Sequence, residues 1–441
     1  MANTIRNQQD ILDKLRISAL NPMQEEALDV IQQSDNIVLL SPTGTGKTLA
    51  FLLPLVKTLN PDCSEVQALV LVPSRELAIQ IEQVVRDMGS GFKVNAVYGG
   101  RSISKDKIEL KHTPAILIGT PGRIADHFRS DRFPKTDIKT LVLDEFDKSL
   151  ETGFEGEMSE IIQQLPNLRK RILTSATQGV EIPPFVQLDS PTIINYLKDK
   201  KTSRLTIKKV IAKEKDKLQT LADLLHHIGN EPGIIFCNFK DSIERVSTFL
   251  NNERINHTCF SGGMEQRDRE RSLIKFRNGT CQVLVATDLA ARGIDIPEMK
   301  FIIHYELPRA VEEFTHRNGR TARVNEKGTA YVLQGKKEFV PEFIRDLETM
   351  DISNKAPRKP LSNSQSWETL FISGGRKDKI SKGDIAGLFF KQGGIKKDQL
   401  GVIELKQDCA FVSVPLPIAN QLVHKLNNSR LKNKKVRVTV L

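Results

Sequence analysis

The stretch "TLVLDEFDKSLE" (140–151) places three acidic side chains at the end of a short apolar segment that reads as a β-strand. Asp144, Glu145 and Asp147 would repel one another at this spacing unless a cation or another strong partner lies among them. A helix cap would account for one of the carboxylates but not for all three. The cluster therefore predicts a site for a positively charged group, with Phe146 placed between its acids.

A second chemical signature lies nearer the N-terminus, where the apolar segment "NIVLLS" (36–41) runs directly into "PTGTGKT" (42–48). Glycines in such a loop let backbone N–H groups turn toward phosphate, a lysine reaches the β- and γ-phosphates, and a threonine binds magnesium. The strict pattern begins with glycine, whereas this chain has serine. The predicted nucleotide-binding loop is Ser41, Pro42, Thr43, Gly44, Thr45, Gly46, Lys47 and Thr48.

Together the two signatures predict one nucleotide-hydrolysing centre. In such enzymes a second strand end supplies an aspartate to the magnesium shell, and Asp144 stands at that place. Glu145 is then positioned to orient or deprotonate the attacking water, while Mg²⁺ and Lys47 keep both carboxylates ionised. Thr48 and Asp144 are the predicted magnesium ligands.

The elements that would position these residues are short, continuously apolar segments that alternate with helical patterns. Continuous rather than alternating apolar strands indicate parallel sheets covered by helices on both faces. Apolar residues at helical spacing predict a helix over 75–88. The strand pattern stops in a weakly patterned stretch near 196–206 and then starts again, which predicts two α/β units in series. The predicted strands are 36–41, 68–72, 115–119, 140–143, 171–175, 233–237, 282–286, 300–304 and 329–333.

A segment rich in Pro, Ser, Asn and Lys (354–366) predicts a linker. The remainder reads as a small β-α-β-β-α-β domain, with strands over 369–374, 401–405, 410–414 and 435–440 and helices over 382–392 and 417–428. The predicted organisation is a first domain (1–200), a second domain (206–350), a linker (351–366) and a C-terminal domain (367–441).

Composition is ordinary for a globular protein of 441 residues, with 39% hydrophobic and 27% charged residues. The net charge of +11 is unevenly placed, because residues 366–441 carry 14 Lys and Arg against 6 Asp and Glu. A basic C-terminal segment indicates an anionic polymer as partner, and a solvated lysine-rich surface is the alternative. Scattered cysteines, a polar N-terminus and apolar runs shorter than the ~18 residues of a membrane span predict a cytoplasmic protein that does not bind membranes.

Ten ordered blocks resemble the DEAD-box RNA helicases, a branch of superfamily 2, over about residues 20–335. They are "PMQEEAL" (22–28), "SPTGTGKT" (41–48), "VPSRELA" (72–78), "YGG" (98–100), "GTPGR" (119–123), "LDEFD" (143–147), "SAT" (175–177), "IIFCN" (234–238), "ATDLAARGID" (286–295) and "HRNGRTAR" (316–323). The resemblance implies two tandem RecA-like domains and RNA-stimulated ATP hydrolysis.

The resemblance also implies further roles around the nucleotide. Gln24 matches the glutamine that reads the adenine edge, which makes ATP the nucleotide; its amide offers both a donor and an acceptor. Further roles fall on three groups. They are a coupling group (Asp147, Ser175 and Thr177), two arginines that reach the γ-phosphate (Arg320 and Arg323), and two nucleotide-facing residues (Gly293 and Asp295).

Four positions depart from the family pattern. Phe146 replaces the usual alanine, and because every carboxylate persists we expect local repacking rather than lost chemistry. Asn7 stands where a phenylalanine is common, so stacking on adenine would be weaker or come from elsewhere. Ser74 replaces threonine and Ala322 replaces glycine, changes that we expect to alter affinity rather than activity.

Other matched positions imply a grip on an RNA backbone. Small residues and exposed amides suit phosphate contacts, which carry no sequence information, and a 2′-hydroxyl would distinguish RNA from DNA. Each glycine alone would be an ordinary turn, but their joint placement at strand ends favours RNA. The predicted RNA contacts are Pro73, Ser74, Arg75, Gly99, Gly100, Thr120, Gly122, Arg123, Asn238, Gln266, Arg267 and Thr287.

The C-terminal domain resembles an RNA-recognition fold (RRM-like). Phe371 and Phe411 stand at base-stacking positions, whereas Cys409 and Val414 replace two expected aromatics; either phenylalanine could instead be part of the core. Basic segments cover 374–379, 393–399 and 429–438. The predicted RNA contacts here are Arg376, Lys377, Lys434 and Arg437.

This tail is very similar to the C-terminal domain of the bacterial DbpA helicases, through the "GGRKDK" loop, the "KGDI" helix start and the "LKNKKVRV" end. That similarity implies binding to a hairpin of large-subunit ribosomal RNA and action on ribosomal precursor particles, by a monomer. Two alternatives stay open: an ATP-gated RNA clamp without productive unwinding, and a general RNA chaperone in cold adaptation or mRNA decay.

Overall fold

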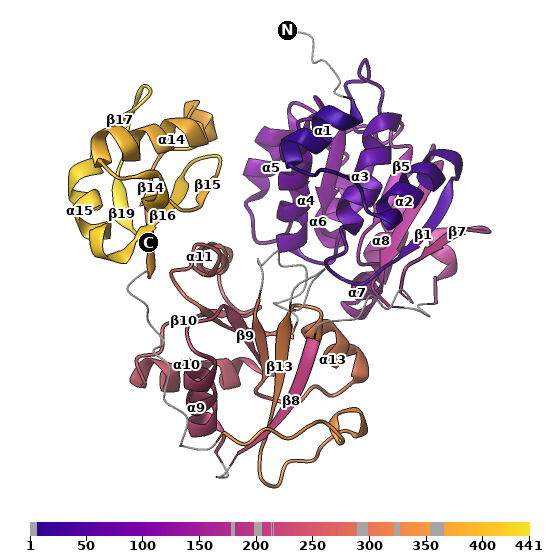
Figure 1. The fold of residues 1–441 in the computed structure, drawn as a ribbon. Helices are drawn as coiled ribbons and strands as arrows, with labels where there is room; N and C mark the ends of the chain where they lie inside the picture. Colours follow the sequence, from indigo (N-terminus) through magenta and orange to yellow (C-terminus); the bar gives the residue numbers. More distant parts are fainter. Residues whose placement is uncertain are drawn as a thin grey trace. The chain divides into compact units, whose positions relative to one another are not determined.

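The computed structural model describes residues 7–177, 181–197, 205–212, 214, 216–288, 299–321, 327–352 and 366–441 (Figure 1). The chain divides into two compact units, the first made mainly of Met1–Ser203 and the second made mainly of the residues from Arg204 onward. The second unit contains an α/β lobe (residues 205–352, the second lobe) and the C-terminal domain (residues 366–441). In the described residues no helix combines the length and the apolar character that crossing a membrane requires.

The first unit is built on a seven-stranded sheet in the order β3-β4-β2-β5-β6-β1-β7, and every described pairing in it is parallel. β2, β3, β4 and β5 are buried along their whole length, as the continuously apolar sequences of β2, β4 and β5 predict. β3 contains an asparagine and was not among the predicted strands. The strands are β1 (Asn36–Leu40), β2 (Ala68–Leu71), β3 (Val94–Val97), β4 (Ile116–Gly119), β5 (Thr140–Leu143), β6 (Lys170–Ser175) and β7 (Thr192–Asn195).

Helices cover both faces of this sheet. One core cluster joins apolar residues of α1 to α4 to the sheet, and another joins α6 to α8 to its opposite side. The predicted helix over 75–88 is α4. The helices are α1 (Gln8–Leu15), α2 (Pro22–Gln33), α3 (Lys47–Thr58), α4 (Arg75–Met88), α5 (Ile103–Leu110), α6 (Pro121–Arg129), α7 (Phe146–Glu151) and α8 (Glu155–Gln163).

The second lobe repeats the architecture with a six-stranded parallel sheet in the order β10-β11-β9-β12-β13-β8. Its strands are β8 (Leu205–Ile211), β9 (Gly233–Cys237), β10 (His257–Phe260), β11 (Val283–Thr287), β12 (Phe301–His304) and β13 (Gly328–Gln334). Its described helices are α9 (Leu218–Ile228), α10 (Lys240–Asn252), α11 (Gln266–Arg277) and α13 (Val311–Asn318). The prediction of two tandem RecA-like parallel-sheet folds is confirmed.

The C-terminal domain is a four-stranded antiparallel sheet in the order β15-β16-β14-β19 with two helices. Its elements are β14 (Trp367–Ile372), α14 (Lys382–Leu388), β15 (Ile403–Leu405), β16 (Ala410–Pro415), α15 (Leu416–Leu426) and β19 (Val438–Val440). This is the predicted β-α-β-β-α-β order. One detail differs: the strand predicted over 435–440 is divided, because Lys434–Lys435 (β18) pairs instead with Arg430–Leu431 (β17) as a small hairpin.

Most of the predicted linker (351–366) lies outside the described residues, so the domain boundaries stay predictions.

Candidate nucleotide and RNA sites

The loop between β1 and α3 forms a tight cradle. Gly44 and Gly46 have φ values of 81° and 89°, a left-handed backbone that favours glycine. A Cβ placed on Gly46 would come 2.5 Å from Nε2 of Gln24, so only glycine fits. Lys47 is buried, and its Nζ donates to the backbone O of Ser41 at 2.5 Å and of Pro42 at 3.0 Å. The lysine charge is thus held inside the curve of the loop.

Gln24 lies against this cradle at the start of α2. Its Oε1 accepts from the backbone N of Asn21 at 3.0 Å, and its Nε2 donates to the backbone O of Gly46 at 3.2 Å. Asn21 completes a capping box and donates from Nδ2 to the backbone O of Thr45 at 3.0 Å. A primary amide has two donor hydrogens and two acceptor lone pairs, so these two bonds use one of each on Gln24.

Asp144 follows β5 and is almost fully buried, 3% exposed. Burial raises the pKa of Asp144, against the opposing effects of the hydroxyl of Thr174, which donates to Oδ1, and of the charge of Lys47. A desolvated carboxylate beside one lysine is the environment that a divalent cation would stabilise. The structure therefore brings together the acid and the lysine that sequence analysis assigned to one centre.

Glu145 has φ 49° and ψ 50°, a left-handed conformation uncommon for a residue with a side chain. Its backbone N donates to Oδ1 of Asp144 and to Oγ1 of Thr174, each at 3.2 Å, which holds the turn. Strain of this kind is concentrated at functional sites. The next residue, Phe146, is 2% exposed and packs in the core under α8, so its bulk is absorbed away from the acids.

The third acid contacts the SAT segment. Oγ1 of Thr177 donates to Oδ2 of Asp147 at 3.1 Å, and the hydroxyl of Ser175 lies 3.2 Å from that of Thr177. Nζ of Lys148 lies 3.4 Å from the same Asp147 oxygen. The expected contact of Asp147 is therefore present with Thr177, while Ser175 is linked to Asp147 only through Thr177. These bonds tie α7 to the end of β6.

The predicted RNA contacts of the first unit gather at the carboxyl ends of three neighbouring strands, β3, β4 and β2. Ser74 caps α4 by accepting from the backbone N of Leu77 at 3.2 Å, and the guanidinium of Arg75 packs against Gly99 and Gly100. Pro73 is half-buried beside them, and Thr120 is the residue before α6. A Cβ added at Gly122 would have its nearest neighbour 4.0 Å away, so the backbone there is open to a ligand.

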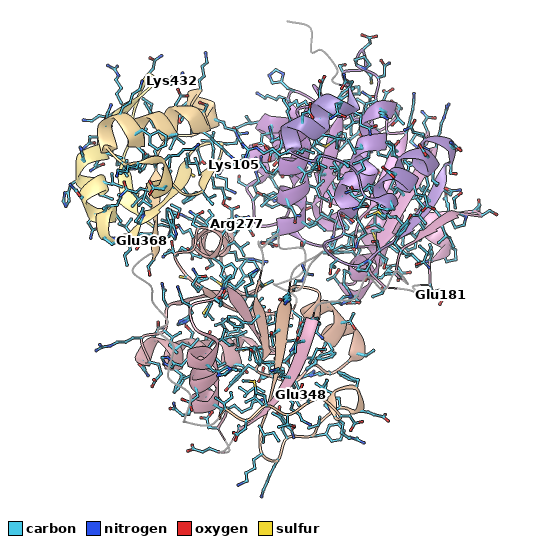
Figure 2. The ribbon with its side chains drawn as sticks, viewed as in Figure 1. Lys105, Glu181, Arg277, Glu348, Glu368 and Lys432 are labelled. Carbon is cyan, nitrogen blue, oxygen red and sulfur yellow. The ribbon has the colours of Figure 1, made fainter. Side chains whose placement is uncertain are left out.

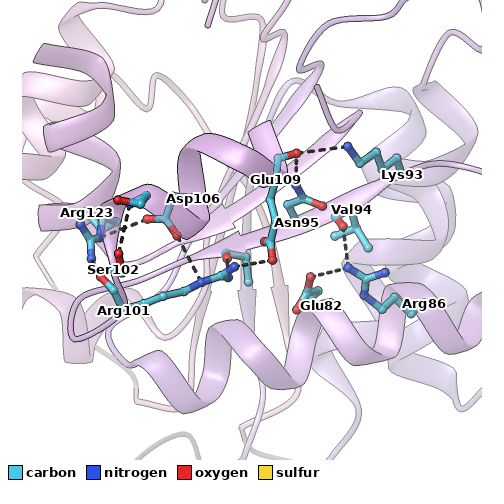
Figure 3. A network of polar contacts seen from close by, with 12 residues as sticks. Glu82, Arg86, Lys93, Val94, Asn95, Arg101, Ser102, Asp106, Glu109 and Arg123 are labelled. Atoms are coloured by element: carbon cyan, nitrogen blue, oxygen red, sulfur yellow. Dashed lines mark hydrogen bonds and ion pairs between the residues drawn. The ribbon is translucent and has the colours of Figure 1, made fainter. Parts of the chain in front are cut away.

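Arg123 is placed differently, because it is 8% exposed and braces a loop. Its Nε donates to the backbone O of Tyr98 at 3.1 Å, and its Nη2 donates to the backbone O of Arg101. Asp106 of α5 is fully buried, with its carboxylate 3.4 Å from Arg101 and 3.5 Å from Arg123 (Figure 3). Nε2 of His127 lies 3.2 Å from the same carboxylate. The loop after β3 is thus fixed by a buried carboxylate that sequence analysis did not single out.

In the second lobe, β11 and β9 are neighbours, so Thr287 and Asn238 lie at the same sheet edge. The side chain of Asn238 donates to the backbone O of Leu307 at 3.1 Å and accepts from Nη2 of Arg317 at 2.7 Å. Arg317, 1% exposed, also makes a two-point ion pair with Asp288 at 2.7 and 2.5 Å. Gln266 and Arg267 begin α11.

Of the predicted γ-phosphate residues, Arg320 is 8% exposed just after α13. Gly293, Asp295 and Arg323 lie outside the described residues.

Several residues that position the sites were missed from the sequence. They are Asn21, Asp106, Thr174, Arg317 and Glu306, whose Oε2 accepts from the backbone N of Asn238. Arg317 stood inside the block "HRNGRTAR" and Asn21 directly before "PMQEEAL", so proximity to a block was the available signal. Nothing in the local sequence marks Asp106, whose partners come from other elements.

In the C-terminal domain, Nζ of Lys434 lies 2.7 Å from Oδ2 of Asp378, while Lys377 and Arg437 are exposed and Arg376 is half-buried. The rings of Phe371 and Phe411 meet edge to face at 5.7 Å. Phe411 is 6% exposed and Phe371 is half-buried.

Comparison with known proteins gives three family matches along the chain. Residues 21–182 match the DEAD/DEAH box helicase family, residues 216–325 the helicase conserved C-terminal domain, and residues 369–440 the DbpA RNA binding domain.

Among curated proteins, the ATP-dependent RNA helicase DbpA of Bacillus subtilis is 31% identical, over 97% of this chain and 96% of that protein. The DbpA protein of Escherichia coli is also 31% identical, over 98% and 96%. Among solved structures, S. cerevisiae Dbp5 bound to RNA and ADP BeF3 aligns with a TM-score of 0.66 at 26% identity. That alignment covers 76% of this chain and 89% of Dbp5. The chain belongs to the DEAD-box ATP-dependent RNA helicases of the DbpA type.

Proposed function

We propose that this RNA helicase locally unwinds or remodels ribosomal RNA during assembly of the large ribosomal subunit. The observation that carries the proposal is the C-terminal domain, which matches the DbpA RNA binding domain over 369–440. Resemblance to the DbpA helicases implies a hairpin of large-subunit ribosomal RNA as its target. The partners would be ribosomal precursor particles, and we propose a cytoplasmic monomer.

At the nucleotide, we propose that the cradle of residues 41–48 binds the triphosphate and that Gln24 selects adenine. Thr48 and Asp144 would hold Mg²⁺, which would neutralise charge on the phosphates. The buried carboxylate of Asp144 and the hydroxyl at the start of α3 are hard oxygen donors of the kind that Mg²⁺ prefers. Glu145 would orient the attacking water and accept its proton.

Coupling to RNA would run through Asp147, Thr177 and Ser175 in the first unit, where Asp147 contacts Thr177 and Thr177 contacts Ser175. Arg320 and Arg323, from the second lobe, would add positive charge to the transferring phosphate, and Gly293 and Asp295 would face the nucleotide. Because these groups belong to different units, hydrolysis would require closure of the two around ATP and RNA.

RNA would be held through its backbone by the strand-end residues of both units. Hydroxyls, glycines and helix-start amides such as those at Ser74, Thr120 and Gly122 suit phosphate contacts without reading sequence. Specificity would come from the C-terminal domain, which tethers the enzyme near its target and raises the effective concentration of the adjoining duplex.

The test is RNA-stimulated ATP hydrolysis and strand separation, measured with large-subunit ribosomal RNA hairpins and with unstructured RNA of equal length. We expect the hairpins to stimulate more strongly, and deletion of residues 367–441 to abolish the difference. Equal stimulation by both RNAs, unchanged by the deletion, would replace the ribosomal assignment with a general RNA chaperone. Hydrolysis without strand separation would indicate an ATP-gated clamp.

A further inference from the structure

The carboxyl edge of the second-lobe sheet carries an exposed aromatic ring. β9 lies between β11 and β12, and the three strands are parallel, so the residues that follow them meet at one edge. Thr287 pairs with Cys237 in the register of β11 and β9, and Phe239 stands two positions beyond Cys237. Phe239 is 52% exposed and directly follows Asn238. The ring therefore lies beside two residues that are proposed contacts to the RNA backbone.

An arginine from the next strand connection lies against this ring. The guanidinium of Arg309, between β12 and α13, is 5.1 Å from the centroid of the Phe239 ring, and Arg309 is itself exposed. A single exposed phenylalanine is ordinary, but holding a cation over it restricts two side chains that would otherwise move freely. Phe239 stays half exposed even with the guanidinium beside it. The pair therefore presents an open aromatic surface next to a positive charge.

Hydrogen bonds hold the turn that carries Phe239. The carboxylate of Glu306 accepts from the backbone N of Asn238 at 2.5 Å and from Oγ of Ser242 at 2.7 Å, so it spans this turn. Nδ2 of Asn238 donates to the backbone O of Leu307 at 3.1 Å, which ties the turn to the connection after β12. A group that is already fixed in place loses little freedom when a ligand binds. The backbone on both sides of the ring is therefore preorganised.

The opposite edge of the same sheet has a different use. α11 leads from β10 to β11 and so ends at the amino edge, where Nη2 of Arg277 lies 2.9 Å from Oε1 of Glu404 in the C-terminal domain (Figure 2). The first residues of α11, Gln266 and Arg267, lie at the carboxyl edge. Phe239 thus shares its edge with the proposed RNA contacts of the second lobe.

We propose that Phe239 and Arg309 form a stacking site for one unpaired base of the bound RNA. An aromatic face attracts any of the four bases, and a neighbouring guanidinium adds cation–π attraction and positive charge near the phosphates. A base inside a duplex is already paired and stacked, so the site accepts a base only from an unpaired position. The inference rests on the proposed RNA path, to which it adds a base contact that favours the separated strand.

The test compares two RNA probes that share one backbone. They are a short oligouridine and an oligomer of equal length whose riboses carry no bases, each bound to the full-length protein with a non-hydrolysable ATP analogue. The ratio of the two affinities, the base preference, reports on base contacts because both probes carry the same phosphates. Phe239→Ala and Phe239→Leu should each lower the base preference about tenfold, and Phe239→Trp should keep it. Arg309→Ala should lower it about threefold.

Phe339→Ala is the matched control, because Phe339 is an exposed phenylalanine (82%) of the same lobe, in the loop after β13. Its base preference should equal that of the unchanged protein. An unaltered base preference in both Phe239→Ala and Phe239→Leu would overturn the stacking site. A loss in Phe239→Ala that Phe239→Leu does not share would also overturn it, because apolar bulk without an aromatic face would then be sufficient.

These outcomes are separable from those of the proposed function. Thr287→Ala removes a proposed backbone contact, so it should weaken both probes by the same factor and leave the base preference unchanged. If it does so while Phe239→Ala has no effect, the stacking site alone is wrong. If neither variant alters the binding of either probe, the RNA path of the second lobe is wrong as well. The preference for ribosomal hairpins is measured with other RNAs and can hold in either case.

Discussion

The loop at residues 41–48 and the outer face of the C-terminal sheet are both rich in small polar residues, and they use them in opposite ways. In the loop, left-handed glycines and the inward-held Lys47 shape a cradle whose rim, at Pro42 and Gly44, stays exposed. On the sheet, the hydroxyls of Thr369 and Ser413 are consumed by the second lobe. Small polar residues can bind a ligand where the fold leaves them exposed. The same residue types make contacts within the protein where another element covers them.

The largest effect is expected at the open site. Glu145→Gln keeps the shape of the side chain but removes the proton acceptor, so ATP hydrolysis should fall about 100- to 10,000-fold. Lys47→Ala should abolish hydrolysis as well, by removing the charge held against the phosphates. Steady-state hydrolysis with saturating RNA measures both.

Glu145→Gln should still bind ATP and RNA together in a long-lived complex, whereas Lys47→Ala should not. Glu155→Gln, an exposed acid in the first turn of α8, is the matched control and should hydrolyse ATP normally. Normal turnover in Glu145→Gln would show that the base has been assigned to the wrong residue.

Much of the fold follows from the sequence because its strands are apolar along their whole length. The segments 68–72, 140–143 and 233–237 correspond closely to β2, β5 and β9, and the helix predicted over 75–88 is α4. Strands with mixed sequences were missed. β3 ("VNAV") contains an asparagine that hydrogen-bonds to α5, and β10 ("HTCF") is half-buried at a sheet edge.

The residues of the candidate sites also divide into those that a local sequence pattern predicts and those that it does not. Residues whose chemistry lies within one motif, such as Lys47 and Gly46, were found from that motif. The pairing of Asp147 with Thr177, 30 positions apart, was expected from the family resemblance. Asp106 depends on Arg123 and His127 as well as on the nearby Arg101, and the hydroxyl of Thr369 depends on Thr280, 89 positions away. No local pattern encodes the distant contacts. Burial that depends on contacts between residues far apart in the sequence is therefore what local sequence patterns did not predict.

The carboxyl ends of β2, β3 and β4, where the predicted RNA contacts of the first unit lie, combine both kinds of residue. Arg123 is a proposed RNA contact, and it is also buried and holds the loop after β3 through hydrogen bonds. Asp106→Asn would leave Arg101 and Arg123 without their buried counter-charge, which should lower the free energy of unfolding of the first unit by about 3 kcal/mol. Chemical denaturation measures the loss, and a higher RNA concentration for half-maximal ATP hydrolysis should accompany it.

Asp126→Asn is the matched control, because Asp126 pairs with Arg129 at the surface, where such pairs contribute less than about 1 kcal/mol. Equal stability in the two variants would show that the buried network does not hold the loop after β3.

A smaller effect is expected on the basic side of the C-terminal domain. Lys434→Ala combined with Arg437→Ala should weaken binding of the hairpin. The slope of the logarithm of affinity against the logarithm of salt concentration should become shallower by about two, because each lost phosphate contact lowers that slope by about one. Filter binding across a salt series measures it. Lys337→Ala, exposed in the second lobe, should leave the slope unchanged. A slope that is also unchanged in the double variant would place the RNA on another surface.

The smallest effect is expected from Thr369→Val, which keeps the shape of a docked side chain and removes only its hydroxyl. Asn278 and Thr280 would each lose a hydrogen-bond partner, so the C-terminal domain should be held less firmly, by about 1 kcal/mol. Amide exchange at residues 411–413 measures this change. Affinity for the hairpin should be unaffected, because the hydroxyl faces the lobe and not RNA. Thr439→Val, on the same face but exposed at β19, should alter neither quantity. The contrary result would be that Thr369→Val weakens RNA binding as much as the Lys434 and Arg437 double variant does. That result would show that the outer sheet face, like the loop at residues 41–48, is a ligand site.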